Sequence, residues 1–231
     1  MLDEFGNKIS DERGDTATFG RNGIRTIRIK NNNGNLNVKS LTILIRIKLR
    51  ESGSTRTIVE FSAQGKPIFL LSLQQNNLRF SLNSSDGERL NASMILDSKG
   101  VEERKFYSLA VAYSHTTGHV TLYSSSGEPY SGFLGFYEVE EPEYVYMGNN
   151  MESVMGRSNE QHSLEQFLGR MECFMVYRRS LSFSEIPQAD NLCERLLDKG
   201  NDDDYDNDND NDDESGGKLG YRILLFMSNC S

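Results

Sequence analysis

Hydrophobic and polar residues alternate with a period of two along much of the chain, which is the pattern of β-strands with one buried face. The clearest example is LTILIRIKLR at 41–50, where Leu or Ile occupies every second position. Residues 105–123 carry the same pattern on both sides of the polar turn SHTTG and predict a β-hairpin. Further strands are predicted at 26–30, 57–63, 67–73 and 78–83.

A helical period is hard to find before residue 183. The one predicted helix is SEIPQADNLCERLL at 184–197, with Ser184 as its cap and Pro187 as an interruption. Short strands at regular intervals with a single helix predict an all-β antiparallel sandwich. A chain of 231 residues fits one large β domain.

Charge is concentrated near the end of the chain. The run at 201–214 holds eight Asp and one Glu without a basic residue, and the remaining chain has 25 basic and 25 acidic residues. The run shares the alternation of calcium loops but lacks their turn glycine, so we expect a disordered acidic linker at 197–217. The apolar segment that follows predicts a strand at 218–231 that returns to the main domain, residues 1–196.

Several classes of partner have little support in this composition. No basic stripe with interleaved aromatic residues is present, which argues against nucleic-acid binding. No stretch approaches the roughly 18 consecutive apolar residues of a membrane span. We therefore expect no membrane insertion. The first ten residues also lack the apolar centre of a secretory signal.

Three cysteines allow one disulfide and leave one thiol. We expect Cys193 to pair with Cys230, because this bond would close a loop around the acidic run and pin the last strand. Cys173 is then expected to be a buried thiol. Sequons for N-glycosylation occur at Asn83, Asn91 and Asn229 and permit an extracellular setting.

The hairpin at 105–123 resembles the hairpin of laminin G-like and related concanavalin A-like jelly rolls, with Phe106 at a position where the family has Trp. Shorter matches occur in the order of the family at 17–20, 40–48 and 144–150. The segment 167–186 is the most specific match. Its family-like positions are Phe167, Gly169, Leu181, Ser182, Glu185 and Ile186.

This resemblance implies an antiparallel jelly-roll β-sandwich of laminin G-like type, and it extends to thrombospondin N-terminal-like and pentraxin-like relatives. Many family members bind calcium through an Asp after the strand Tyr and through an Asp-Gly turn. The present chain has Ser114 and Ser125-Ser126 at these places. We therefore expect no cofactor and at most weak calcium dependence. Asn149 and Asn150, with Asn76 and Asn77, are weak candidate ligands.

The sequence matches known arrangements of catalytic residues poorly. Glu138, Glu140 and Glu143 lie near the arrangement of some jelly-roll glycoside hydrolases, in which one carboxylate attacks and another delivers the proton. The middle residue is Glu rather than Asp, however, and the chain has no Trp to stack a sugar ring. His115 and His119 flank the hairpin turn without a nearby carboxylate or Cys to complete a metal site. We expect no catalytic residues.

The function predicted from the sequence is a non-catalytic extracellular recognition module that binds a protein or a glycan in cell adhesion or matrix assembly. Two alternatives remain open: a structural amino-terminal globule of a larger collagen-like or thrombospondin-like protein, and a glycoside hydrolase. The ligand is expected at a rim made by the 114–118 turn and the 148–163 loop. The candidate rim residues are Ser114, His115, His119, Asn149, Asn150, Arg157 and Asn159.

Overall fold

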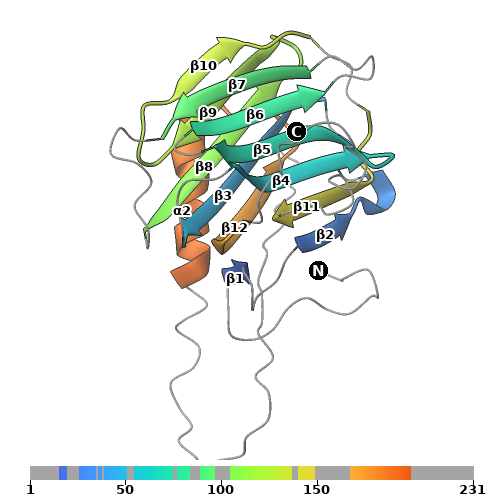
Figure 1. The fold of residues 1–231 in the computed structure, drawn as a ribbon. Helices are drawn as coiled ribbons and strands as arrows, with labels where there is room; N and C mark the ends of the chain where they lie inside the picture. The colour runs from blue at the N-terminus through green and yellow to red at the C-terminus, as the bar shows by residue number, and fades with distance from the viewer. Residues whose placement is uncertain are drawn as a thin grey trace, which may run out of the picture.

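The computed structural model describes residues 16–19, 26–34, 36–37, 39–50, 55–74, 77–83, 89–96, 105–136, 140–148 and 167–198. These residues form two six-stranded antiparallel sheets that face each other as a sandwich (Figure 1). Sheet I has the strand order β1-β12-β3-β8-β9-β10, and sheet II has the order β2-β11-β4-β5-β6-β7. The all-β sandwich predicted from the sequence is confirmed.

The elements have the following bounds. The strands are β1 (Thr16–Phe19), β2 (Thr26–Lys30), β3 (Leu41–Leu49), β4 (Thr55–Ala63), β5 (Lys66–Gln74), β6 (Asn77–Asn83), β7 (Arg89–Ile95), β8 (Phe106–Ser114), β9 (His119–Ser124), β10 (Tyr130–Phe133), β11 (Tyr144–Gly148) and β12 (Gly169–Tyr177). A 3₁₀ helix, η1, spans Asn32–Gly34, and the helix α2 spans Glu185–Asp198. The predicted linker and returning strand lie outside the described residues, except for the end of α2.

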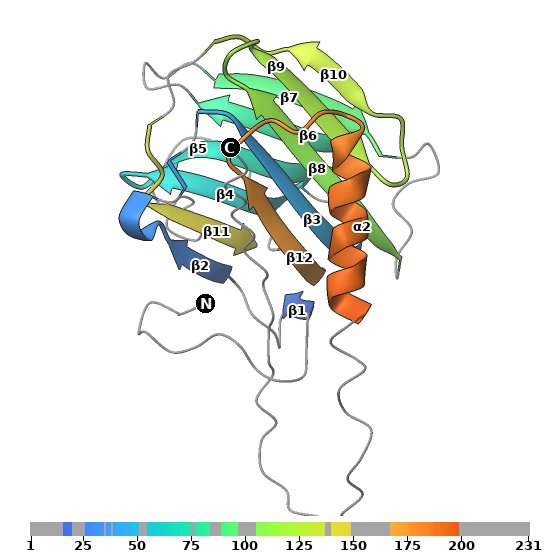
Figure 2. The ribbon, with the colours of Figure 1, turned by 180° about the vertical axis from the view of Figure 1, so that it is seen from behind.

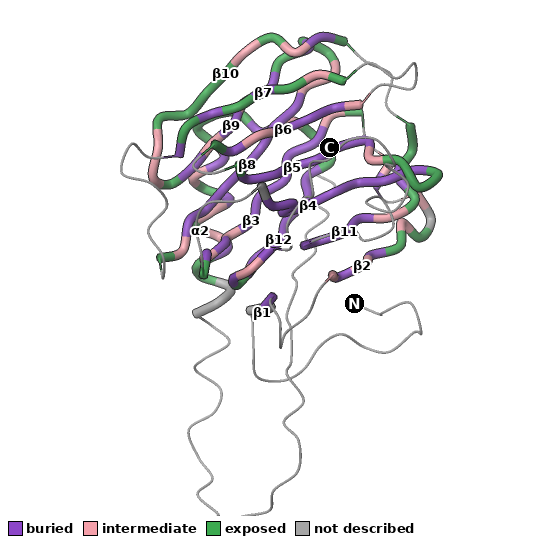
Figure 3. Tube along the Cα trace, viewed as in Figure 1, coloured by how far each residue is buried: buried purple, intermediate pink, exposed green. Residues whose placement is uncertain are grey.

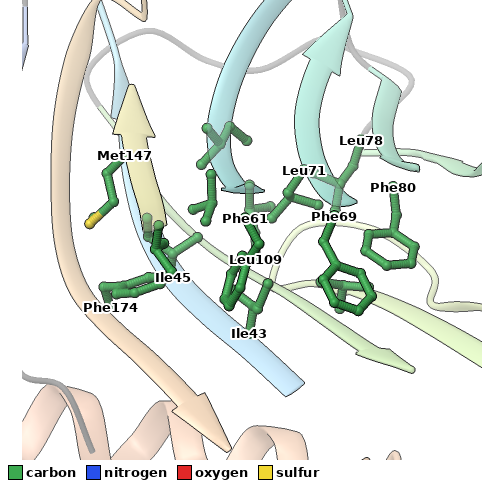
Figure 4. Packing of buried hydrophobic residues seen from close by; sticks show 14 of the residues in the cluster. Ile43, Ile45, Phe61, Phe69, Leu71, Leu78, Phe80, Leu109, Met147 and Phe174 are labelled. Atoms are coloured by element: carbon green, nitrogen blue, oxygen red, sulfur yellow. The ribbon is translucent and has the colours of Figure 1, made fainter. Parts of the chain in front are cut away.

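The core lies between the two sheets and is built from the apolar sides of the strands other than β10, as the alternation predicts. Figure 3 shows this buried interior along the central strands of both sheets. Phe61 and Phe69 meet edge to face at 5.8 Å between ring centroids, and Phe69 stacks on Phe80 at 6.0 Å. Ile43 and Leu109 of sheet I lie in the same cluster (Figure 4). Aromatic rings thus fill much of the space between the layers.

Strand β12 buries side chains on both of its faces and contains a β-bulge. Its register with β3 shifts between Glu172 and Met175, and Cys173 has a positive φ of 51°. Phe174 therefore points into the core between the sheets, whereas Cys173 and Met175 belong to a second cluster on the outer face of sheet I. The extra residue of a bulge changes which face the following side chains occupy.

The helix α2 covers this second cluster (Figure 2). Ile186, Ala189 and Cys193 are buried and spaced as one face of a helix. They pack on Leu44 of β3 and on small alanines of β8. The covered part of sheet I is thus β12, β3 and β8, together with Tyr123 of β9, which is partly buried against the cluster.

The cap of α2 is Ser182, not Ser184 as the sequence suggested. The Ser182 backbone N–H and hydroxyl both donate to the Glu185 carboxylate, at 2.8 and 2.7 Å. The bond from the backbone N–H is the one that the Glu side chain accepts in a capping box. Hydrogen bonds from Arg179 and then from Ser182 lower the pKa of Glu185 to about 2. Pro187 does not end the helix, because so near the start its missing N–H removes at most one helical hydrogen bond.

The predicted pairing of Cys193 with Cys230 is wrong, because Cys193 is bonded to Cys173. The bulge in β12 turns Cys173 outward, and α2 brings Cys193 over it with 5.9 Å between the Cα atoms, a usual separation for a disulfide. Cys173 is therefore a bonded cysteine rather than a buried thiol. The bond fastens α2 to sheet I.

We predict that this disulfide contributes measurably to stability. It closes a loop with a sequence separation of 20, which corresponds to about 3 kcal/mol in the chain-entropy model. The double variant Cys173→Ala/Cys193→Ala should lose about that much unfolding free energy in urea titrations, and Cys230→Ala should lose little. Non-reducing peptide mapping that joins Cys193 to Cys230 would contradict the assignment.

Candidate functional site

The turn between β8 and β9 is fixed by its own polar groups. Its backbone closes through the Gly118 N–H, which donates to the Ser114 carbonyl at 2.8 Å. The Ser114 hydroxyl accepts from the Thr117 N–H at 3.3 Å and lies 3.1 Å from the Thr116 hydroxyl. The His115 N–H donates to the Ser40 hydroxyl at 2.9 Å. The hydroxyl of the predicted rim residue Ser114 therefore already makes hydrogen bonds within the turn.

Three rings gather beside this turn. The His119 and Phe133 rings meet at 5.6 Å between centroids, and the Phe133 and Phe136 rings meet at the same separation. Phe133 is 63% exposed and Phe136 is 61% exposed. We call His119, Phe133 and Phe136 the aromatic cluster.

The backbone holds the aromatic cluster in place. The Gly118 carbonyl accepts hydrogen bonds from the N–H groups of Leu134 and Gly135, at 2.7 and 3.0 Å. The buried Tyr113 hydroxyl donates to the Gly135 carbonyl at 3.0 Å. The segment between Phe133 and Phe136 is thus tied both to the turn and to the core, so the exposed rings are carried on a well-supported backbone.

His119 has a defined tautomer in its neutral form. Its Nδ1 lies 2.9 Å from the Thr117 carbonyl oxygen, which can only accept a hydrogen bond. Nδ1 therefore carries the proton and donates, and Nε2 of this exposed ring is left as an acceptor. His115 is a poorer candidate for meeting a ligand, because its Nδ1 is buried with no hydrogen-bond partner in the described part of the chain.

The segment of the chain that carries the aromatic cluster is almost free of charge. Between residues 106 and 136 the only Asp, Glu, Lys or Arg is Glu128. Thr121 and Ser131 place hydroxyls on the outer face of β9 and β10, where they form a hydrogen bond of 3.4 Å. On the same face Tyr123 contacts Phe183, which is 52% exposed. Aromatic rings and hydroxyls therefore dominate this part of sheet I.

The outer face of sheet II is different and carries mixed polar groups. One row crosses the sheet through paired positions on six strands: Arg28, Tyr146, Glu60, Leu70, Ser81 and Asn91. The Arg28 guanidinium lies 3.8 Å from the centroid of the Tyr144 ring, a cation–π contact. Glu60 is only 1% exposed. Sequence analysis did not single out Glu60, although a charge between Val59 and Phe61 of a strand was a visible signal.

The three acidic residues weighed for glycoside hydrolysis are only partly described. Glu138 lies outside the described residues. Glu140 and Glu143 are exposed and stand in the connection before β11. The Glu143 carboxylate accepts from the Gln64 N–H at 3.3 Å, at the turn between β4 and β5.

The remaining candidate residues divide between described and undescribed parts of the chain. Asn83 is half-buried, and its amide donates to the Pro67 carbonyl, whereas Asn91 is exposed on β7. No group of three or more His, Cys, Asp or Glu side chains that could hold a metal ion occurs among the described residues. The candidate residues that lie outside the described part of the chain are Asn76, Asn149, Asn150, Arg157, Asn159, Asn229 and Cys230.

Residues 22–187 match the model of the Laminin_G_3 family, described as the concanavalin A-like lectin/glucanases superfamily. The chain belongs to this superfamily. The laminin G-like resemblance seen in the sequence is thereby confirmed, and the superfamily by its description contains both lectins and glucanases. No helix among the described residues is long and apolar enough to cross a membrane. No curated protein matches the sequence.

Solved structures with the superfamily fold resemble this chain at low identity. A native heptameric SAP-like pentraxin from Limulus polyphemus is 17% identical with a TM-score of 0.54, covering 76% of this chain and 81% of the pentraxin. The botulinum neurotoxin serotype D binding domain is 15% identical with a TM-score of 0.53, covering 80% and 42%. The serotype G binding domain is 10% identical with a TM-score of 0.56, covering 78% and 42%. This chain thus spans about two fifths of the toxin domains, and these likenesses show the fold alone.

We predict that Gly118 is required for the geometry of the aromatic cluster. Its φ is +66°, and a Cβ placed there would lie 2.6 Å from the Phe133 ring and 3.0 Å from the Gly135 backbone. Gly65 has a similar φ of +73° but open space around it, so Gly65→Ala is the matched control.

Both alanine variants should lose about 1 kcal/mol from the left-handed backbone conformation. Gly118→Ala should lose more and should also shift the Phe133 ring resonances in NMR spectra. Equal losses of unfolding free energy with unchanged Phe133 resonances would show that Phe133 does not pack on the turn.

Proposed function

We propose that the chain is a non-catalytic extracellular recognition module that binds a protein or glycan ligand in cell adhesion or matrix assembly. The ligand contacts the aromatic cluster and the adjoining 114–118 turn. Superfamily membership supports a binding role, because the description of the superfamily names lectins as well as glucanases. The site itself is argued from this chain's own residues.

The observation that carries the proposal is the exposure of the aromatic cluster. Phe133 and Phe136 leave most of their surface in water, whereas the large apolar side chains of β3 and β8, such as Ile43, Ile45 and Leu109, are buried. Aromatic side chains gain free energy when a ligand covers them and are enriched among the residues that dominate binding energy. Rings held on a supported backbone lose little conformational entropy on binding.

Hydrogen-bonding groups beside the rings would orient a bound ligand. His119 offers Nε2 as an acceptor, and the Thr116 and Thr117 side chains are exposed in the turn. The lack of charge favours a ligand, or a part of one, that is itself uncharged. This chemistry suits neutral hydroxyl-rich groups and apolar protein side chains. Asn149, Asn150, Arg157 and Asn159 of the 148–163 loop remain proposed contributors, and calcium is proposed to have little influence.

We predict that Phe133 dominates binding. Once a glycan and matrix-protein array identifies a ligand, Phe133→Ser should weaken binding by roughly 30-fold, the effect of about 2 kcal/mol for a central aromatic contact. Ile95→Ser is the matched control, because Ile95 is 65% exposed on β7 of the other sheet. Both variants should keep the wild-type melting temperature. A chelator should change the affinity little.

Two results would contradict this assignment. Full binding by Phe133→Ser would place the ligand elsewhere. Equal weakening by Ile95→Ser would indicate non-specific adsorption to exposed apolar side chains.

A glycoside hydrolase is the second candidate, because Glu60 is buried on the outer face of sheet II beside Tyr146. Glycoside hydrolysis ordinarily needs two carboxylates. Glu60 is the one carboxylate that the described strands of sheet II put on this face. We therefore predict that no reducing ends are released from a panel of β-glucans and galactans. Release that Glu60→Gln abolishes, with Glu143→Gln as the control, would instead make the chain an enzyme.

A further inference from the structure

The strand β10 presents an open edge. Within the described residues it is the last strand of sheet I, paired on one side with β9 alone. Tyr130, Ser131 and Phe133 are all exposed, so no other described part of the chain covers the strand. Figure 3 shows β10 as an exposed border of the sandwich, and Figure 2 shows α2 lying over other strands.

The register identifies which backbone groups are free for pairing. The Leu134 N–H donates to the Gly118 carbonyl, so position 134 belongs to the hydrogen-bonded pairs of the β9–β10 ladder. Such pairs alternate along an antiparallel ladder, so Gly132 and Tyr130 also direct their backbone groups toward β9. Ser131 and Phe133 consequently direct their N–H and C=O groups toward the open edge.

Nothing in the sequence of β10 protects this edge. Natural edge strands are usually guarded by charged side chains, prolines, bulges or a covering segment. The strand YSGF has no charge, no proline and no bulge in its pairing with β9. The edge strands of sheet II differ, because β2 carries Arg28 and Lys30 and β7 begins at Arg89. At the other edge of sheet I, Phe19 of β1 is buried.

We propose that β10 pairs antiparallel with β10 of a second copy of this chain, about a two-fold axis at Gly132. Ser131 then lies opposite the second copy's Phe133, and the reverse pair follows by symmetry. Every outward N–H and C=O of these two residues gains a partner. The two copies of sheet I become one continuous sheet.

The chemistry of the edge favours a second copy over other occupants. A two-fold interface must be self-complementary, and an edge without charge brings no like charges together although the whole chain has a net charge of −9. Gly132 adds no side chain at the axis. The exposed rings of Tyr130 and Phe133 would lose water on pairing.

The edge strand β10 has only 4 residues, so pairing it buries less surface area than a stable interface does. The dimer is therefore expected to be weak and to form only at high protein concentration. Because it contains no ion pair, added salt should strengthen it by screening the net charge.

The test is sedimentation velocity of the full chain without ligand, over roughly three decades of concentration. The wild type should shift from monomer to dimer as concentration and salt rise. Ser131→Pro removes an outward N–H without removing a β9–β10 hydrogen bond, so it should remain a monomer. Both Ser131→Pro and Ser131→Ala remove the Ser131 hydroxyl, but Ser131→Ala keeps the backbone N–H. It should therefore dimerise as the wild type does.

Hydrogen exchange provides a second measurement that does not depend on how well the proline variant folds. In the wild type, the amides of Ser131 and Phe133 should exchange rapidly at low concentration and slowly at high concentration. A wild type that remains monomeric throughout would overturn the proposal. So would dimerisation of a folded Ser131→Pro variant, or unchanged exchange at these amides. The experiment uses no ligand, so its outcome is separate from that of the proposed binding function.

Discussion

Helix α2 covers only part of the outer face of sheet I, and the rest of the surface depends on where this cover ends. β12, β3 and β8 carry the apolar and small side chains of the second cluster on that face, and α2 covers them, fastened by the Cys173–Cys193 bond and the Ser182 cap. Tyr123 of β9 still packs against this cluster, whereas His119 of β9 and Phe133 of β10 are exposed to water. The exposed cluster at His119, Phe133 and Phe136 exists because the covering layer stops where it does.

Much of this architecture could be predicted from the sequence, because one-sided burial leaves a period of two that is visible without any structure. Leu41 to Leu49 is the clearest example, and it forms β3 at nearly the predicted bounds. The bulge in β12 could not be predicted in this way. Every residue from Cys173 to Tyr177 is buried, on alternating sides, and an unbroken apolar run does not reveal its parity.

The errors follow from that bulge and from choices among equivalent residues. Pairing Cys193 with Cys230 seemed reasonable when Cys173 was taken for a core residue, since only the turned backbone brings it to the outer face. Ser182 and Ser184 are both good caps, and the position of Glu185 relative to each decides between them. Phe133 and Phe136 were missed because an exposed ring in a short glycine-containing segment breaks no pattern.

Recognition and catalysis place different demands on such a sandwich. A binding surface needs exposed groups on a supported backbone, which the hairpin and β10 supply. Catalysis needs two acids that converge on one bond, and Glu60 stands as a single carboxylate among the described side chains of its face. The solved structures that share the fold are too distant in sequence to decide between these roles. The decision therefore depends on individual residues such as Phe133 and Glu60.

The strand order also has a consequence for how the chain can be made. β12 lies between β1 and β3, and β11 lies between β2 and β4, so strands from the first 63 residues are completed only by strands after residue 143. Contacts this distant in sequence slow folding. A nascent chain emerging from a ribosome would hold several unpaired strands until Tyr177 had been added. Synthesis of this domain therefore includes a long interval in which unpaired strand edges are exposed and prone to aggregation.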